Sequence, residues 1–493
     1  VTNNGGSTWK SIPVTKLGIP ERSFVNDIKA DLYDPNTVYV SLDNHKEGDY
    51  SPYLFKSSDL GESWESISNN IPDRTLVWRF VQDHIKKDLF FLATEYGIYT
   101  SLNAGKNWQK LPGSPTISFK DIVIQEREND LIGASFGRGF FVLDDFSALR
   151  EMSEDNLSKK GKLFEPRDAK LYKPRNSYGN TGAQFYVAKN PEYGAVFTYH
   201  LKDMPKTSKS KRIQSERKLN SDKKDVPFPG YDAISKEMNE KPASIILTIK
   251  DSEGNHIRNV KKNASNGSGR IAWNLRHKSY FPVRAGSSGP RWGYFNPSGP
   301  YVTPGEYHAE FYLENNGSVE KLDGPISFNV KPLRKGTLEG ASYDDYNSFR
   351  IRVSNLYIEM SKYQDEFNMM KTKIELLDKA SLQLETFSPE IMKKISDFKT
   401  KYNAFDSETD GNPAKAEIGE WDKPSISMRT QIAMQGLSTS YGPTDLNKSN
   451  LDIAEKLFDK LALDVKMFKS ELESLENEVK ELNPPHLSGS GIN

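Results

Sequence analysis

The sequence contains no cysteine among its 493 residues. Without thiols the chain has no disulfide bond, no cysteine nucleophile and no cysteine-ligated zinc, and its redox compartment stays undetermined. The 67 basic and 67 acidic residues cancel, so the overall charge favours neither nucleic acid nor an anionic membrane as a partner. No apolar run is long enough for a membrane-spanning helix.

Motifs that hold metals, phosphates or acyl groups are also missing. The 7 histidines never fall at metal-ligand spacing. No GxSxG, P-loop or GxGxxG motif is present. The polar segment Asp43–Tyr50 alternates its oxygen ligands imperfectly for a calcium loop. We therefore expect no cofactor and no metal.

What the sequence does contain is an eight-residue pattern, S/T-x-D/N-x-G-x-x-W, which begins at residues 2, 57 and 101. The second and third copies follow alternating apolar stretches typical of strands. A short Asx side chain can bond to the backbone of a tight turn, glycine supplies a positive φ, and tryptophan packs the turn onto the sheet. We expect the three tryptophans to be buried equivalently. The Asx, Gly and Trp positions are Asn4, Gly6 and Trp9, then Asp59, Gly61 and Trp64, then Asn103, Gly105 and Trp108.

This pattern is the Asp-box, and the chain resembles the Asp-box (BNR) β-propellers of sialidases, xyloglucanases and the sortilin/Vps10 group. The Gly137–Asp145 segment is similar to the closing strand of large bacterial Vps10-like proteins, which are often labelled glycosyl hydrolases. The resemblance implies that residues 1–150 are the C-terminal blades of a β-propeller, in a chain that is part of a longer polypeptide. Blade equivalents are expected at about residues 21–70, 72–112 and 115–147.

Residues 151–184 are interpreted as a linker, and residues 185–332 as an immunoglobulin-like β-sandwich. Short alternating strands between Gly and Pro turns favour this fold, with Trp273 as a core anchor. A basic insertion at 205–241 has hardly any apolar side chain in its first half. We expect it to be a solvated, mobile loop, with docking of an acidic partner or an anionic glycan as the alternative.

Residues 343–485 are expected to be helical. Apolar residues recur in alternating threes and fours over 349–377 and again over 451–482, a 3.5-residue repeat that predicts a coiled-coil seam. The simplest arrangement is a long antiparallel helical hairpin. A shorter helix is expected near 389–405, irregular chain over 406–447, and a linker-like tail at 486–493. The fold class is thus mainly β with an α C-terminus.

Paired carboxylates are the chemistry that a glycosidase needs. Asp43, Asp49, Glu95, Asp144 and Asp145 are the carboxylates considered for such a pair, with Glu95, Asp144 and Asp145 as the weak catalytic candidates. Each also has a structural explanation as a cap, a turn residue or an ion-pair partner. We therefore expect no catalytic residue in this chain.

Function follows from the architecture and the resemblance. The favoured hypothesis is a non-catalytic, extracytoplasmic recognition or scaffold subunit, secreted or on a bacterial cell surface, that binds a protein or a glycan. The partners expected are protein subunits of a surface complex or a glycan, and no nucleic acid. The alternative is a glycoside hydrolase of the Asp-box propeller type whose catalytic carboxylates lie partly outside this chain.

Overall fold

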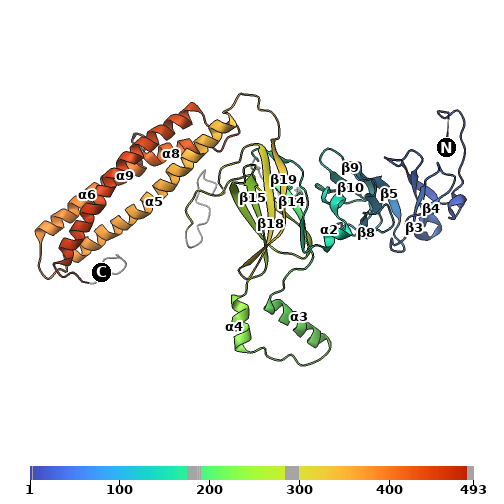
Figure 1. Cartoon of the computed structure of the whole chain (residues 1–493), viewed down its shortest axis with the longest axis horizontal. Helices are drawn as coiled ribbons and strands as arrows, with labels where there is room; N and C mark the ends of the chain where they lie inside the picture. Colours follow the sequence, from blue (N-terminus) through green and yellow to red (C-terminus); the bar gives the residue numbers. More distant parts are fainter. Residues whose placement is uncertain (3, 175–185, 187, 189, 284–298, 486–493) are drawn as a thin grey trace.

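The computed structural model describes residues 1–2, 4–174, 186, 188, 190–283 and 299–485. The chain is elongated, with small sheets near the N-terminus, a two-sheet body in the middle and a bundle of long helices toward the C-terminus (Figure 1). The expected order of mainly β structure followed by helices is confirmed. The tail expected at 486–493 lies outside the described residues.

The N-terminal part holds three small antiparallel sheets whose strands pair in chain order. They fall within the three ranges expected from the repeat. The first contains β1 (Phe24–Ala30), β2 (Val38–Asn44), β3 (Asp49–Ser57) and β4 (Glu65–Ser66); the second contains β5 (Val77–Gln82), β6 (Phe90–Thr94), β7 (Gly97–Ser101) and β8 (Gln109–Lys110); the third contains β9 (Phe119–Gln125), β10 (Asp130–Ser135) and β11 (Phe140–Leu143).

The three sheets pack face against face through apolar residues. Tyr39 of the first sheet stacks on Phe80 of the second, with 4.3 Å between ring centroids. On the opposite face of the second sheet, Phe91 and Ile98 share a buried cluster with Phe119 of the third. The second sheet is therefore covered on both sides, and the same packing step is repeated along the chain.

The repeated eight-residue turn closes through its own side chains. The Ser57 hydroxyl accepts a hydrogen bond from Gly61 N at 2.8 Å and donates to Asp59 Oδ1 at 2.8 Å. The Asp59 carboxylate in turn accepts from the Ser63 hydroxyl and amide, and these bonds lower its pKa. Gly61 has a φ of 90°, which explains why glycine is required there. In the other two copies the glycine amide likewise donates to the hydroxyl that opens the pattern: Gly6 N to Thr2 and Gly105 N to Ser101, each at 2.9 Å.

The expected burial of the three tryptophans is confirmed for only one of them. Trp108 is 2% exposed and donates its Nε1–H to the carbonyl of Ile67, whereas Trp64 is half-buried and Trp9 is 72% exposed. Residues from the preceding turn region cover the later copies: Ile67 lies over Gly105, and Ile12 over Gly61. At the first copy, the atoms nearest to the Cβ position of Gly6 belong to the Trp9 ring itself.

Two further sheets enclose one core in the middle of the chain. Trp273 is fully buried there, as expected, and its ring packs at a tilt of 57° against Tyr307, with 5.3 Å between ring centroids. All strand pairs are antiparallel except β13 with β19, which is parallel. One sheet contains β12 (Gly161–Leu163), β14 (Ala195–Leu201) and β17 (Gly267–Trp273); the other contains β13 (Ala169–Leu171), β19 (Ser318–Pro332), β18 (Gly305–Asn315), β15 (Ser244–Asp251) and β16 (His256–Asn263). Two short helices, α1 (Ala148–Glu151) and α2 (Glu154–Ser158), precede these strands.

The basic insertion forms two helices rather than the expected irregular loop: α3 (Ser208–Ser221) and α4 (Tyr231–Asn239). Polar contacts stabilise these two helices. A search for periodic apolar residues in the sequence therefore does not detect them. Thr207 caps α3, and Arg212 forms a two-pronged ion pair with Glu237 of α4, with both N–O distances 2.8 Å.

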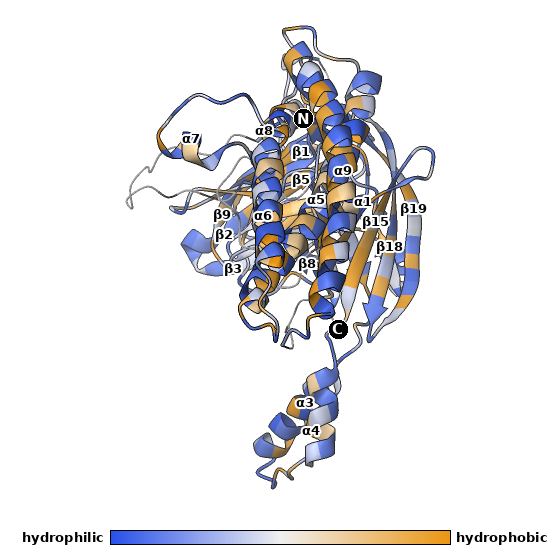
Figure 2. Ribbon diagram, turned by 90° about the vertical axis from the view of Figure 1, so that its left-hand side faces the viewer, coloured by the Kyte–Doolittle hydropathy of each residue, from blue (hydrophilic) through white to orange (hydrophobic). Residues whose placement is uncertain are grey.

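The C-terminal part is a bundle of long helices. It contains α5 (Tyr343–Ser381), α6 (Pro389–Asp410), α8 (Ile426–Gln435) and α9 (Asp445–Lys480), with the short α7 (Pro413–Glu417) beside them. The expected seam is confirmed, since almost every apolar position of the repeat is buried in a single cluster. Figure 2 shows hydrophobic and hydrophilic residues alternating along these helices. The prediction of irregular chain over 406–447 was wrong, because α6 continues to Asp410 and the helices α7 and α8 follow it.

The antiparallel pairing expected for the two longest helices is also wrong. Ion pairs between α5 and α9 join Arg352 to Asp452 at 2.6 Å and Lys373 to Glu476 at 2.8 Å, so residue numbers rise together and the helices run parallel. The physical reason is α6, which runs back along them. Lys394 and Lys401 of α6 pair with Glu478 and Glu471 of α9 at 2.5 and 2.7 Å, so residue numbers fall on α9 as they rise on α6 and these two helices are antiparallel.

Candidate functional site

Glu95 lies in the turn between β6 and β7, and three donors surround its carboxylate. Glu95 Oε2 accepts hydrogen bonds from Trp78 Nε1 at 3.0 Å and from the Ser118 hydroxyl at 2.9 Å. Lys120 Nζ lies 3.7 Å from the same oxygen and 3.1 Å from the centre of the Trp78 ring. Burial lowers the pKa of Lys120, and the carboxylates nearby oppose this shift.

Asp43 of the first sheet and His45, which directly follows β2, complete this group. Asp43, at the end of β2, is 2% exposed and bonds to His45 Nδ1. The His45 ring meets Trp78 edge to face at 5.8 Å. We name the five residues Asp43, His45, Trp78, Glu95 and Lys120 the Trp78 cluster. It joins all three sheets at one end, where internal donors already occupy the Glu95 carboxylate.

Sequence reasoning considered Asp43 and Glu95 but did not place them together, and it missed Trp78 and Lys120. A signal for these two did exist. Trp78 and Lys120 are each the second residue of the first strand of their sheet, β5 and β9. Aligning the repeats by their first strands would therefore have placed them at neighbouring positions.

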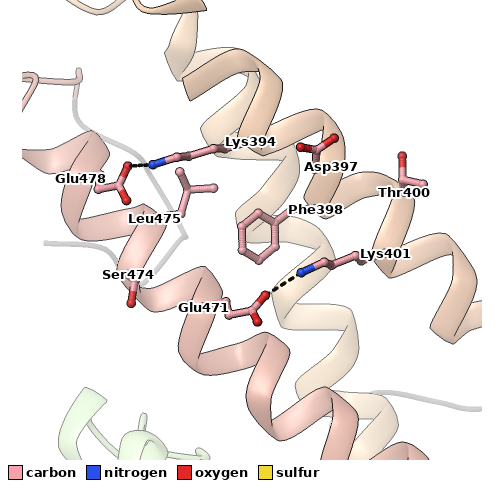
Figure 3. Close-up of a pocket in the computed structure, with 9 residues that line it drawn as sticks. All are labelled: Lys394, Asp397, Phe398, Thr400, Lys401, Glu471, Ser474, Leu475 and Glu478. Carbon is pink, nitrogen blue, oxygen red and sulfur yellow. Dashed lines mark hydrogen bonds and ion pairs between the residues drawn. The ribbon is translucent and has the colours of Figure 1, made fainter. Parts of the chain in front are cut away.

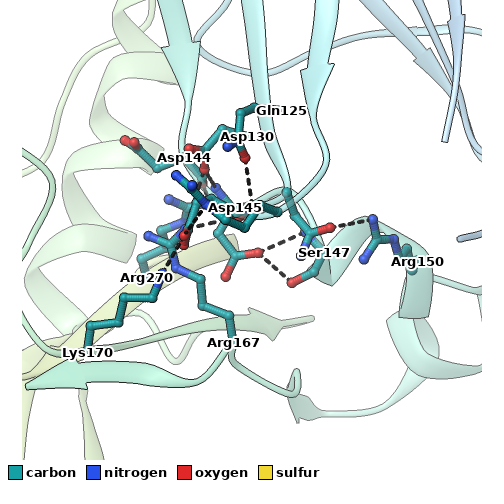
Figure 4. Close-up of polar contacts among 12 residues, drawn as sticks. Gln125, Asp130, Asp144, Asp145, Ser147, Arg150, Arg167, Lys170 and Arg270 are labelled. Carbon is teal, nitrogen blue, oxygen red and sulfur yellow. Dashed lines mark hydrogen bonds and ion pairs between the residues drawn. The ribbon is translucent and has the colours of Figure 1, made fainter. Parts of the chain in front are cut away.

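Asp144 and Asp145 lie where the third sheet meets the central two-sheet body (Figure 4). Arg270 of β17 donates to both of their backbone carbonyls, at 2.7 Å for Asp145. The Asp145 carboxylate accepts from the Ser147 hydroxyl at 2.6 Å, and its amide donates to Asp130 Oδ1 at 2.9 Å. The Asp144 carboxylate points away from these contacts (Figure 4). The Arg270 contacts thus connect the third sheet to the central two-sheet body, and the Asp145 carboxylate bonds to its near neighbour Ser147.

Two of the candidate carboxylates, Glu95 and Asp145, lie at opposite ends of β9. Glu95 bonds to Ser118, just before β9 begins, whereas Asp145 bonds to Asp130, just after the turn that follows β9. A strand of seven residues separates points about 20 Å apart. Retaining and inverting glycosidases hold their carboxyl groups roughly 5–10 Å apart. Glu95 and Asp145 are therefore too far apart to act as such a pair.

The remaining sequence candidates also bond internally. Asp49 accepts from the Tyr53 hydroxyl at 2.6 Å, an interaction that lowers the pKa of Asp49. Asp43 and Asp49 belong to the polar segment considered for calcium, and both carboxylates have protein partners. Across the part of the chain that the structure describes, no group of three or more His, Asp or Glu residues is arranged to hold a metal ion.

The helical bundle has an open hollow of about 620 Å³ between α6 and α9 (Figure 3). Phe398 and Leu475 form its apolar floor, and the ion pairs Lys394–Glu478 and Lys401–Glu471 bridge it. These pairs are exposed, so each contributes about 0–1 kcal/mol. The rest of its lining is polar and consists of Asp397, Thr400 and Ser474.

No helix within the described ranges is long and apolar enough to span a membrane.

Comparisons with known proteins leave the family open. No protein-family model matches the chain, and no curated protein matches it. Among solved structures, it is similar to an ancestral GH74 enzyme, with 22% identity, a TM-score of 0.20, and coverage of 28% of this chain and 16% of that one. The GH74 xyloglucanase from Xanthomonas campestris matches with 15% identity, a TM-score of 0.18, and coverage of 22% and 18%.

A third structure is the extracellular domain of a protein designated a one-component system from B. thetaiotaomicron, with 10% identity and a TM-score of 0.20. That match covers 63% of this chain and 31% of the other. The chain thus spans between 16% and 31% of the length of these three structures. Overall similarity at this level supports no assignment of activity.

Proposed function

We propose that this chain is a non-catalytic recognition or scaffold unit of an extracytoplasmic protein, and that it binds a protein or a glycan through exposed surfaces. The observation that carries the proposal is the disposition of the carboxylates. Glu95 and Asp145 are bound to internal donors at opposite ends of β9, and Asp43, which lies with Glu95 in the Trp78 cluster, is buried and bonded to His45. What the N-terminal sheets offer to a ligand is therefore surface rather than an acid–base pair.

We further propose that the three sheets are blades of an Asp-box β-propeller within residues 1–150. Their first strands lie side by side: Asn26 of β1 donates to the Val77 carbonyl of β5, and Phe80 N donates to Asp27. Strands β5 and β9 are neighbours in the same way. First strands gathered around one axis, repeated turns and repeated face-to-face packing are all features of a propeller. In this proposal the immunoglobulin-like sandwich consists of residues 185–332 together with β12 and β13, which lie in the range expected to be a linker, and residues 343–485 form the helical unit.

The outer face of the third sheet supports an interaction role. Val123, Ile132 and Val142 lie opposite one another on β9, β10 and β11. Val123 and Val142 are each 53% exposed, and Phe140 on the same face is 77% exposed. A contiguous apolar face of this kind marks a surface that another protein element covers. In a propeller that element is a further blade.

The test is affinity electrophoresis of the chain through gels containing each member of a polysaccharide panel, with the polymer length measured before and after contact. In parallel, crosslinking in a cell-surface extract identifies protein neighbours. The proposal predicts slowed migration or a reproducible crosslinked partner, with the polymer length unchanged. Shortening of a polysaccharide would favour the glycoside hydrolase instead, and the absence of both binding and crosslinking would contradict a recognition role.

A further inference from the structure

The helices α3 and α4 project beyond one end of the central two-sheet body. They are connected to β14 and β15 by the segments 202–207 and 240–243. Both views show the pair apart from the rest of the chain, with the turn between the helices farthest out (Figures 1 and 2). We call this turn, residues 222–231, the tip.

Polar contacts hold this pair of helices together. Arg212 bonds to Glu237 and also to Glu216 at 2.7 Å, and the Ser208 amide donates to Glu240 at 2.6 Å. Both helices are described throughout, and none of their residues is buried. The apolar side chains of the insertion therefore form no core of their own.

Three exposed apolar side chains lie together at the tip. Val226 is 38% exposed, Phe228 64% and Tyr231 82%. The Phe228 and Tyr231 rings meet edge to face at 5.2 Å, so they form one aromatic knob. Leaving two aromatic rings in water has a cost, since burying such a side chain releases about 1.5–3 kcal/mol. Transfer of these rings out of water would therefore be favourable.

The insertion that carries the knob is basic overall, although the tip itself has charges of both signs. Lys223 and Lys224 are exposed in the tip, as are Asp222 and Asp225, and Lys224 Nζ lies 3.9 Å from the Asp222 carboxylate. The insertion 205–241 contains ten Lys or Arg residues and six acidic ones, although the whole chain has no net charge. Exposed aromatic rings beside lysines match the interface of an anionic bilayer, where rings enter the headgroup region and ammonium groups meet lipid phosphates.

We propose that the tip inserts into the surface of an anionic lipid bilayer. The shape of the tip favours a bilayer over a protein groove. Pro227, Pro229 and Gly230, which has a φ of 89°, shape a turn that projects outward. A projecting knob fits a deformable interface without a matching cavity. This inference is independent of the proposed recognition role of the sheets and the bundle.

The experiment is co-sedimentation of the full chain with sonicated vesicles of phosphatidylcholine alone and of phosphatidylcholine with phosphatidylglycerol in a 2:1 ratio. The chain should sediment with the anionic vesicles, and less so as NaCl is raised. Lys223→Gln/Lys224→Gln should weaken the partition on the order of twentyfold, at about fivefold per lysine. The matched control is Arg334→Gln/Lys335→Gln, which removes two adjacent exposed cations elsewhere and should bind as the wild type does.

The absence of cysteine makes a second readout specific. Val226→Cys carrying a polarity-sensitive fluorophore should shift to the blue with anionic vesicles, whereas the same label on Phe387→Cys should not, although Phe387 is 65% exposed. Phe228→Ser should reduce sedimentation, and Phe387→Ser should leave it unchanged. The proposal is overturned if the wild type does not sediment with anionic vesicles. It is also overturned if the tip variants bind as well as their controls, or if the tip label shifts only with a protein partner.

Discussion

The buried indole of Trp108 provides a graded test of how the repeated turn stabilises the sheets. Trp108 and Trp9 occupy the same position of the same eight-residue pattern but are 2% and 72% exposed. Trp108 donates from Nε1 to Ile67 at 2.7 Å, and its backbone exchanges two hydrogen bonds with the Asn70 side chain, each 2.8 Å. Trp108→Ala removes the packed ring and leaves the Ile67 carbonyl without its donor.

The expected loss for Trp108→Ala is about 3–5 kcal/mol, the range for a large aromatic side chain removed from a core. Trp9→Ala removes an exposed ring and should change stability by no more than about 0.5 kcal/mol. Trp64→Ala, at a half-buried site, should fall between the two. The order Trp108, Trp64, Trp9 follows from burial alone, since the residue type and the turn are the same.

Native-state hydrogen exchange with mass spectrometry is the appropriate assay, because a chain with several separate cores does not unfold in one step. The opening free energy of the β6 and β7 amides should drop in Trp108→Ala and stay unchanged in Trp9→Ala. Amides of α5 and α9 serve as an internal reference in every sample. Equal effects of the two substitutions on β6 and β7 would refute the argument from burial.

Three further predictions concern the junction, the bundle and the central body. Arg270→Ala should speed amide exchange at 144–147, because two hydrogen bonds from a charged group are lost there, and Arg334→Ala should not. Lys373→Ala should lower the opening free energy of the α5 and α9 amides by about 1–3 kcal/mol in hydrogen exchange, since it leaves the carboxylate of Glu476, 8% exposed, without its cation; adding Glu476→Gln should restore part of the loss. Two lysine ammonium groups lower the pKa of Glu310 to about 2, so its contribution is complete above pH 4.5 and is lost as pH falls toward 2; a thermal melt of Glu310→Gln should lack this part of the acid destabilisation.

Much of the secondary structure could be predicted because its signals are local. Alternation located the strands around the repeated turns, and the 3.5-residue spacing identified the buried face of α5 and α9. That spacing identifies which side of a helix is buried, but it contains no information about the direction of the neighbouring helix. The direction depends on α6, whose length returns the chain and places α5 and α9 parallel.

The features that the sequence did not predict depend on contacts between residues far apart in the chain. The helices α3 and α4 have few apolar residues, and the pair is held by contacts between Arg212 and Glu237, 25 positions apart. Trp9 and Trp108 lie in two copies of the same kind of turn. Their burial differs because it depends on the residues that cover each turn and not on the turn itself. The Trp78 cluster combines residues from three sheets, so no short motif could indicate it.

The account's central claim is that this chain recognises a ligand without catalysing a reaction. The most direct measurement is the release of reducing ends from a polysaccharide panel incubated with the purified chain, compared with buffer alone. The account predicts no release above the buffer, because Glu95 and Asp145 lie at opposite ends of β9. Release that Glu95→Gln or Asp145→Asn abolishes would contradict it and place the glycoside hydrolase first.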